Sequence, residues 1–208
     1  GYPRNDFLKN YTEEDVLRVR KALGIAEDKK VILYAPTYRD NQHSVKSGGY
    51  TYKTEVDFDR LRDTFSNEYV ILFRPHWLVA REFDFEKYRG FVYDASGFDD
   101  ISELYIISDL LITDYSSVNF DFAYLGKPII YSQFDKETFY QGHLYNPGYF
   151  KYDRDGFGPV ITELDKVVDE LIELMKNDCK NKEEYLARSK AFYYYRDNNN
   201  CERIRQAI

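Results

Sequence analysis

Four short polar segments in this sequence each follow an apolar run directly, and their side chains are of types that bind phosphate. The segments are Ala-Pro-Thr-Tyr-Arg at residues 35–39, Arg-Pro-His at 74–76, Asp-Ala-Ser at 94–96 and Thr-Asp-Tyr-Ser-Ser at 113–117. Together they offer two guanidinium groups, an imidazole, carboxylates and several hydroxyls, a set of groups that suits a phosphate ligand. The pattern therefore predicts a phosphate site made of strand ends.

Ser116 and Ser117 lie between an apolar run and a stretch that is expected to be helical. The free N–H groups and the dipole of a helix N-terminus favour an anion such as a diphosphate. The alternative is that either serine only caps the helix, which serine does routinely, and both interpretations stay open. Asp121, in the same helix, is either a charge of the capping turn or a ligand contact.

His76 is the side chain best suited to proton transfer near neutral pH. A lone histidine is more often structural, so this interpretation depends on its neighbours. Arg74 should project to the same side, where it pairs either with phosphate or with Asp94. Arg39 precedes a polar loop at residues 40–52, which we expect to be mobile and able to close over a substrate. Taken alone, Arg39 would be an exposed loop cation.

Alternating apolar runs and helical periods surround these segments and predict the elements that position them. Strands are expected at residues 31–35, 69–73, 91–93, 110–113, 129–131 and 158–161, and helices at 12–24, 57–65, 99–108, 120–125, 164–175 and 183–192. This alternation predicts an α/β fold, a Rossmann-like and mostly parallel sheet with helices on both faces. Ligands of such sheets bind beyond the carboxyl ends of the strands, where the four polar segments lie.

Length and composition narrow the class of protein. The 208 residues fit a single domain, in which we expect residues 1–10 to be a linker and residues 177–208 a helical extension. A net charge of −7, from 29 Lys and Arg against 36 Asp and Glu, argues against nonspecific nucleic-acid binding. No P-loop or Gly-x-Gly-x-x-Gly motif occurs, which weakens the case for ATP hydrolysis and for NAD.

The cysteines and the apolar runs indicate the cellular compartment of the protein. Cys179 and Cys201 lie far apart in the sequence and outside any Cys-x-x-Cys spacing, so neither a zinc site nor a disulfide is predicted, and no other metal site is expected. The longest apolar runs fall well short of the about 20 residues that cross a bilayer, and no signal peptide is visible. A reducing cytoplasm fits best.

Several segments, in their order along the chain, resemble the CDP-glycerol glycerophosphotransferase family, which contains teichoic-acid polymerases and primases. They are residues 1–6, 34–39, 74–76, 100–105, 108–117, 120–123, 127–128 and 158–160. The combination of Arg-Pro-His with Thr-Asp-Tyr-Ser-Ser is the most specific part. The resemblance implies the C-terminal, donor-binding half of a GT-B fold, in which two Rossmann-like domains face each other across a cleft.

The resemblance also implies a reaction. An acceptor hydroxyl would attack the β-phosphorus of CDP-glycerol or CDP-ribitol and release CMP without a cofactor, extending a teichoic acid or capsule polymer. His76 matches a catalytic histidine, acting as a base or as a phosphate contact, and Ser116 and Ser117 match positions that cradle the pyrophosphate. Further donor contacts would come from Thr37, Arg39, Arg74, Asp114 and Asp121.

The implied partners are the CDP-polyol donor, a lipid-linked or polymer acceptor and an N-terminal domain, with no nucleic acid. A second histidine of the family lies in that domain, in a His-Gly-Thr-Pro segment that this sequence lacks. We therefore expect the chain alone to bind donor and to turn over poorly, and the parent protein to act peripherally at the cytoplasmic face of the membrane. The rivals are a UDP-sugar-dependent GT-B glycosyltransferase or epimerase, a noncatalytic nucleotide-binding module and a purely structural domain.

Overall fold

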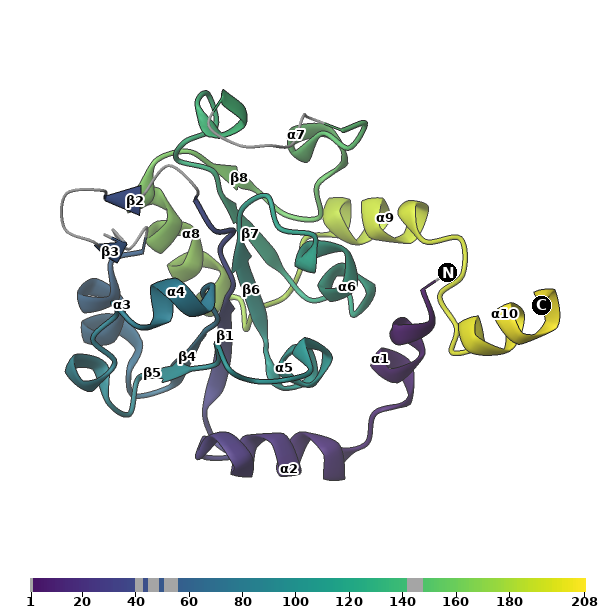
Figure 1. The fold of residues 1–208 in the computed structure, drawn as a ribbon, viewed down its shortest axis with the longest axis horizontal. Coiled ribbons are helices and arrows are strands. Elements are labelled where there is room, and N and C mark those ends of the chain that lie inside the picture. Colours follow the sequence, from purple (N-terminus) through teal and green to yellow (C-terminus); the bar gives the residue numbers. More distant parts are fainter. Residues whose placement is uncertain (1, 40–42, 45–48, 51–55, 142–147) are drawn as a thin grey trace.

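In the computed structural model of the chain, six parallel strands form one sheet with helices on both faces (Figure 1). The structure describes residues 2–39, 43–44, 49–50, 56–141 and 148–208. The strand order is β5-β4-β1-β6-β7-β8. The predicted Rossmann-like α/β fold is therefore confirmed.

The six strands form where apolar runs predicted them. They are β1 (Lys30–Tyr34), β4 (Tyr69–Phe73), β5 (Val92–Asp94), β6 (Leu110–Thr113), β7 (Ile129–Ser132) and β8 (Val160–Ile161). The central strands are buried along nearly their whole length. Continuous apolar runs of this kind are typical of parallel strands that are covered on both faces.

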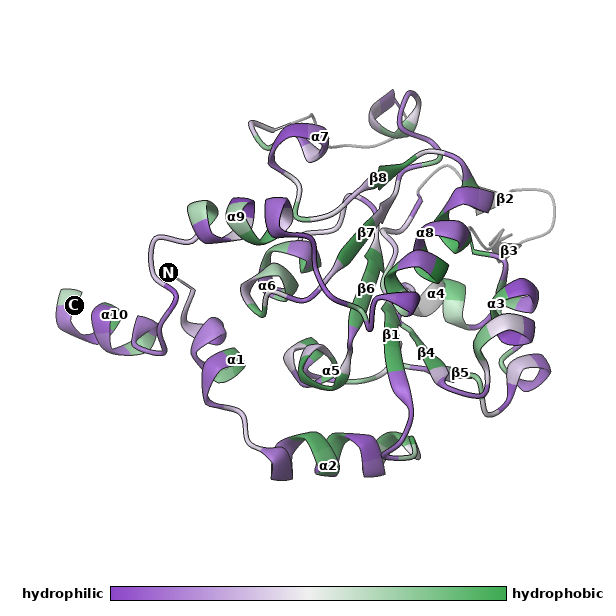
Figure 2. Ribbon diagram, turned by 180° about the vertical axis from the view of Figure 1, so that it is seen from behind, coloured by the Kyte–Doolittle hydropathy of each residue, from purple (hydrophilic) through white to green (hydrophobic). Residues whose placement is uncertain are grey.

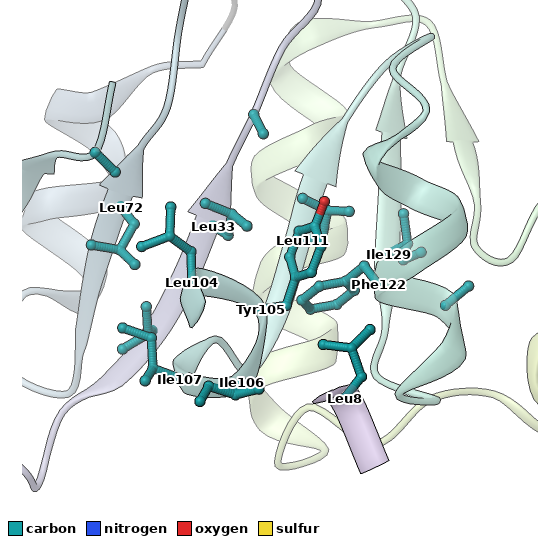
Figure 3. Close-up of a cluster of buried hydrophobic side chains, with 14 of the residues drawn as sticks. Leu8, Leu33, Leu72, Leu104, Tyr105, Ile106, Ile107, Leu111, Phe122 and Ile129 are labelled. Carbon is teal, nitrogen blue, oxygen red and sulfur yellow. The ribbon is translucent and has the colours of Figure 1, made fainter. Parts of the chain in front are cut away.

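Helices cover the two faces of the sheet as two separate layers. The elements of one layer are α1 (Phe7–Asn10), α2 (Glu13–Leu23), α5 (Ile101–Ile107) and α6 (Val118–Tyr124), and those of the other are α3 (Phe58–Phe65) and α8 (Leu164–Lys176). Side chains of a strand alternate between faces, so Val31 and Leu33 enter the first core while Ile32 and Tyr34 enter the second. Figure 3 shows the first core, in which Leu33 and Leu111 of the sheet lie near helical side chains.

Two helix starts show how local chemistry sets the boundaries. Thr12 caps α2 in a reciprocal capping box with Asp15, and Gly24 ends the helix at a φ of +70°, as their positions predicted. The helix expected at residues 99–108 begins at Ile101. Asp100 is its N-cap, because its carboxylate accepts a hydrogen bond from the Ser102 N–H at 2.8 Å.

The chain ends are more structured than the sequence suggested. Residues 1–10, expected as a linker, contain the 3-10 helix η1 (Pro3–Asp6) and α1, and Leu8 is buried in the first core. The extension carries the predicted helix α9 (Glu183–Phe192) and also α10 (Asn200–Ala207), which was not predicted. In Figure 1, α10 lies beside the N-terminal segment and away from the sheet, and Figure 2 shows how hydrophilic it is.

Shorter elements connect these parts. They are α4 (Trp77–Ala80), η3 (Glu86–Tyr88), η4 (Phe139–Gln141) and α7 (Tyr152–Asp155), and two strands β2 (His43–Ser44) and β3 (Gly49–Tyr50) that pair antiparallel. These two strands fall inside the loop predicted at residues 40–52, and the rest of that loop lies outside the described residues. No helix of the described part of the chain has the length and apolar character that a membrane span requires.

Candidate functional site

The four polar segments all lie at one edge of the sheet, called here the carboxyl edge. They follow β1, β4, β5 and β6, and parallel pairing places the ends of these strands together. After β1 the chain builds the sheet outward through β4 and β5, and then returns to the other side of β1 with β6. The point between β1 and β6 is therefore the topological switch point, where α/β proteins bind ligands.

Asp114 occupies this switch point and is almost completely buried, with 1% of its surface exposed. Its carboxylate accepts hydrogen bonds from the Thr37 N–H at 2.9 Å, the Thr37 hydroxyl at 2.6 Å and Arg39 Nη1 at 2.7 Å. It also accepts one from the Tyr115 N–H at 2.5 Å. Because these bonds join the loop after β1 to the loop after β6, Asp114 organises the edge from within.

Arg39 extends this network to the loop that follows a third strand, β7. Its Nε donates to Asp135 Oδ2 at 2.8 Å, and its Nη1 also donates to the Thr37 carbonyl at 2.6 Å. The guanidinium lies 4.8 Å from the centre of the Phe139 ring, and the residue is 5% exposed. The interpretation of Arg39 as an exposed loop cation is therefore wrong. Asp135 was missed, although its position shortly after β7 places it at the same edge.

Arg74 and His76 leave the end of β4 with different surroundings. Arg74 Nη1 donates to the carbonyls of Ala95 at 2.8 Å and Phe98 at 2.6 Å, and burial lowers the pKa of its guanidinium. The alternative pairing of Arg74 with Asp94 is wrong, because Asp94 instead accepts from the Ser96 N–H. His76 is exposed, and its ring centre lies 4.8 Å from that of Tyr38.

Ser116 and Ser117 form the turn that leads into α6. Ser117 is the N-cap residue, yet its side chain makes no capping hydrogen bond, and the residue is exposed. The one hydrogen bond that the Ser116 Oγ accepts from the described residues is long, at 3.5 Å from the Val118 N–H. The Asn119 side chain fixes this turn by donating to the Ser116 carbonyl at 2.7 Å. The first turn of α6 is thus held in shape while the Ser117 hydroxyl stays accessible.

A cavity of about 400 Å³ adjoins the first turn of α6, and we call it the α6 cavity. Its lining residues are Arg4, Phe7, Asp100, Ile101, Ser102, Tyr105, Ser117, Val118 and Asp121. The Tyr105 hydroxyl is buried and has no hydrogen-bond partner among the described residues. Such a group needs a partner, because an unsatisfied buried hydroxyl costs free energy.

Asp121 lies in the wall of the α6 cavity and pairs with Arg4. The Arg4 Nε donates to both carboxylate oxygens at 2.9 Å. Burial raises the pKa of Asp121, and the bond from Arg4 partly offsets that rise. Arg4 and Tyr105 were not predicted as site residues, although both belong to segments that carry the family resemblance.

The site therefore has an open part and an internal part. Ser116, Ser117 and His76 lie at the carboxyl edge, and the α6 cavity, which Ser117 helps to line, offers a hydroxyl and a carboxylate. This arrangement can hold a diphosphate at the helix start with a hydroxyl-bearing group next to it. Among the described residues, no three His, Cys, Asp or Glu side chains gather as metal ligands do.

Comparison with known proteins identifies related chains. The profile of the CDP-Glycerol:Poly(glycerophosphate) glycerophosphotransferase family matches residues 1–208. The teichoic acid poly(glycerol phosphate) polymerase of Bacillus subtilis strain 168 is 44% identical over 181 residues, covering 86% of this chain and 24% of that protein. The teichoic acid poly(ribitol-phosphate) polymerase of Bacillus spizizenii W23 is 34% identical over 187 residues, covering 88% of this chain and 29% of that protein.

A solved structure is similar over nearly the whole chain. The wall teichoic acid polymerase TagF matches with a TM-score of 0.82 at 36% identity, over 98% of this chain and 49% of that chain. A histidine-to-asparagine variant of TagF was also solved after a soak with CDPG. The chain thus spans about a quarter to a half of the length of these relatives.

Proposed function

The chain belongs to the CDP-glycerol:poly(glycerophosphate) glycerophosphotransferase family, and from this premise we propose that it binds the CDP-polyol donor of a teichoic-acid polymerase. The enzyme transfers polyol phosphate to a growing wall or capsule polymer and releases CMP. The observation that carries the proposal is the open first turn of α6, with Ser116, Ser117 and the α6 cavity, on the same edge as the exposed His76.

The geometry suggests how the donor is arranged. The diphosphate lies at Ser116 and Ser117, where main-chain N–H groups and hydroxyls offset its charge. The nucleoside enters the α6 cavity, and the polyol phosphate points along the carboxyl edge toward His76. Phosphoryl transfer depends mainly on positioning and charge stabilisation, which such an edge supplies.

The reaction exchanges one phosphorus–oxygen bond for another. The acceptor hydroxyl oxygen bonds to the β-phosphorus, and the bond from that phosphorus to the oxygen bridging the two phosphates breaks, so that CMP leaves with the electron pair. His76 takes the hydroxyl proton or contacts the transferred phosphate. In this scheme Thr37, Arg39 and Asp114 shape the edge, and we assign them to positioning because their polar groups already bond one another.

The relatives guide the choice of donor. The chain is 44% identical to a poly(glycerol phosphate) polymerase and 34% identical to a poly(ribitol-phosphate) polymerase. We therefore propose CDP-glycerol as the first donor to test. We further propose that this domain acts together with the remaining part of the protein on a lipid-linked acceptor. The whole protein would attach peripherally to the inner face of the membrane.

Calorimetric titration of the chain with CDP-glycerol, CDP-ribitol, CDP and UDP tests the proposal. We expect selective binding of the cytidine nucleotides. The variant Ser116→Ala/Ser117→Ala should bind them about 10- to 100-fold more weakly, because two hydroxyls that contact a charged group are lost. Ser66→Ala is the matched control, since Ser66 follows α3 and lies away from the carboxyl edge.

The alternative outcomes are distinct. Tighter binding of UDP than of CDP would favour a sugar-nucleotide enzyme. Equal affinity of the double variant and the wild type would remove the serines from the site. If neither the chain nor the full-length protein binds a cytidine nucleotide, the proposed function is wrong.

A further inference from the structure

Residues 189–201, which run from the last turn of α9 to the start of α10, are hydrogen-bonded to α6, the helix whose N-cap residue is Ser117. Three side chains of this segment donate to α6 carbonyls: Ser189 Oγ to Ala123 at 2.8 Å, Arg196 Nη2 to Tyr124 at 3.1 Å, and the Tyr193 hydroxyl to Phe120. A helix of seven residues leaves most of its carbonyls without helical partners. The segment therefore adds hydrogen bonds to carbonyls of α6, among them that of Ala123, to which the Gly126 N–H also donates at 3.1 Å.

This contact is buried and runs in both directions. Ser189 is 2% exposed and Tyr193 is 9% exposed. The Tyr124 hydroxyl of α6 donates back to the Asp197 carbonyl at 2.7 Å, and the Tyr193 and Tyr124 rings pack edge to face with centres 5.1 Å apart. Because solvent is excluded and both sides donate, the contact holds α6 in one position relative to the C-terminal segment.

The far end of the segment is fixed by Asp6. Its carboxylate accepts from the Asn200 N–H at 2.9 Å, the Asn200 side-chain amide at 2.7 Å and the Cys201 N–H at 2.8 Å, at the start of α10. Asp6 and Asn200 are both buried. We call these three hydrogen bonds the Asp6 clamp. Figure 1 shows α10 beside the N-terminal segment, where the Asp6 clamp forms.

The Asp6 clamp is connected to the candidate site through η1. Asp6 lies in η1 together with Arg4, and Arg4 pairs with Asp121 in the wall of the α6 cavity. The apolar side chains of Ile204 in α10 and of Ile208 directly after it are exposed, so this helix adds little to the core. Its described contact with the rest of the protein centres on η1.

We infer that residues 189–201 form a strap that positions two walls of the α6 cavity. The strap holds α6 through hydrogen bonds to its carbonyls, and it holds η1, which contains Arg4, through its hydrogen bonds to Asp6. This inference rests on the proposed function in so far as it concerns the donor. Asp6 and Tyr193 are then positioning residues, since neither lines the α6 cavity.

Hydrogen exchange of the chain without nucleotide tests the strap independently of the donor. In Tyr193→Phe and in Asp6→Ala, we expect the amides of α6 to exchange faster than in the wild type, while those of α3 on the opposite face do not change. Tyr193→Phe removes one hydroxyl and keeps the packed ring, so it serves if Asp6→Ala does not fold. Unchanged exchange of α6 in the folded variants would overturn the inference.

Binding of CDP tests the consequence for the site. Asp6→Ala and Tyr193→Phe should weaken binding by about 3- to 30-fold, the range of indirect positioning effects. Asp6→Asn, which keeps one acceptor oxygen, should recover part of the loss. Leu171→Ala is the control, because Leu171 of α8 is buried in the core on the other face of the sheet, and its loss lowers stability without touching the strap.

The outcomes separate this inference from the proposed function. If Leu171→Ala binds CDP like the wild type and the strap variants bind it more weakly, positioning is supported. If the folded strap variants bind CDP as tightly as the wild type, the inference is overturned while the proposed function stands. In the full-length protein, strap variants should raise the KM for the donor and leave kcat within about twofold.

Discussion

The polar residues of the carboxyl edge differ in how far they are buried. Ser117 and His76 remain exposed, whereas Arg39 and Asp114 bond each other with less than a tenth of their surface exposed. A charge at the end of a buried strand must reach solvent, a ligand or an opposite charge, because burying it unpaired is costly. Arg39 finds its partners inside the protein, so its contribution to the site is the shape of the edge.

Lys127 is a half-buried charge outside the site whose titration can be measured. Its ammonium group donates to three carbonyls at the end of α5, Tyr105, Ile106 and Ser108, at distances of 3.1, 3.1 and 2.6 Å. Burial lowers the pKa of Lys127 to about 8, from 10.5. Between these values the unfolded chain binds more protons than the folded chain, so this group makes the free energy of unfolding rise with pH.

We therefore predict that Lys127 raises the free energy of unfolding by about 2 kcal/mol between pH 7 and 9.5. Lys127→Met should abolish that rise, whereas Lys190→Met, at an exposed position, should keep it. Urea denaturation at a series of pH values measures the slope for each protein. Equal slopes in the wild type and in Lys127→Met would contradict the prediction.

At the scale of elements, main-chain contacts set which substitutions the sheet tolerates. Gly158 lies just before β8, and a Cβ there would come within 1.8 Å of the Ile129 carbonyl oxygen. The neighbouring Pro159 carbonyl accepts the Tyr131 N–H at 2.9 Å, which ties this turn to β7. Because the obstacle is backbone rather than a flexible side chain, relief requires β8 to shift.

We predict that Gly158→Ala lowers the free energy of unfolding by about 2–4 kcal/mol, since a strand must move. Gly97→Ala is the matched control, because a Cβ at Gly97 would meet nothing within 4 Å. It should change stability by less than about 0.5 kcal/mol. Thermal denaturation compares the two variants, and similar melting temperatures for both would show that the turn before β8 adapts.

At the scale of the whole molecule, the chain is one α/β unit whose carboxyl edge carries the candidate site. It corresponds to 49% of the solved TagF chain. His76 is exposed at this edge and contacts the Tyr38 ring, so its removal leaves the core intact. Its contribution to turnover can therefore be separated from its contribution to folding.

We predict that His76→Ala in the full-length protein slows CMP release from CDP-glycerol by about 100-fold or more, the usual contribution of a group that transfers a proton. The free energy of unfolding of the chain should change by less than about 0.5 kcal/mol. Arg89→Ala, at another exposed position, is the control for turnover. Unchanged CMP release in His76→Ala would favour a noncatalytic role for this domain.

The strands, the parallel sheet, the common edge of the polar segments and the family could all be predicted from the amino-acid sequence. Local apolar runs such as Leu110–Thr113 predict buried strands, and the order of the motifs along the chain indicates the family. Which polar groups of the site and of the strap pair with each other depends on the tertiary structure, because the partners are distant in sequence. Arg39 and Asp114 are 75 positions apart, Arg4 and Asp121 are 117 apart, and Asp6 and Asn200 are 194 apart. Such pairs form only once the sheet has brought the loops together, and no local pattern specifies them.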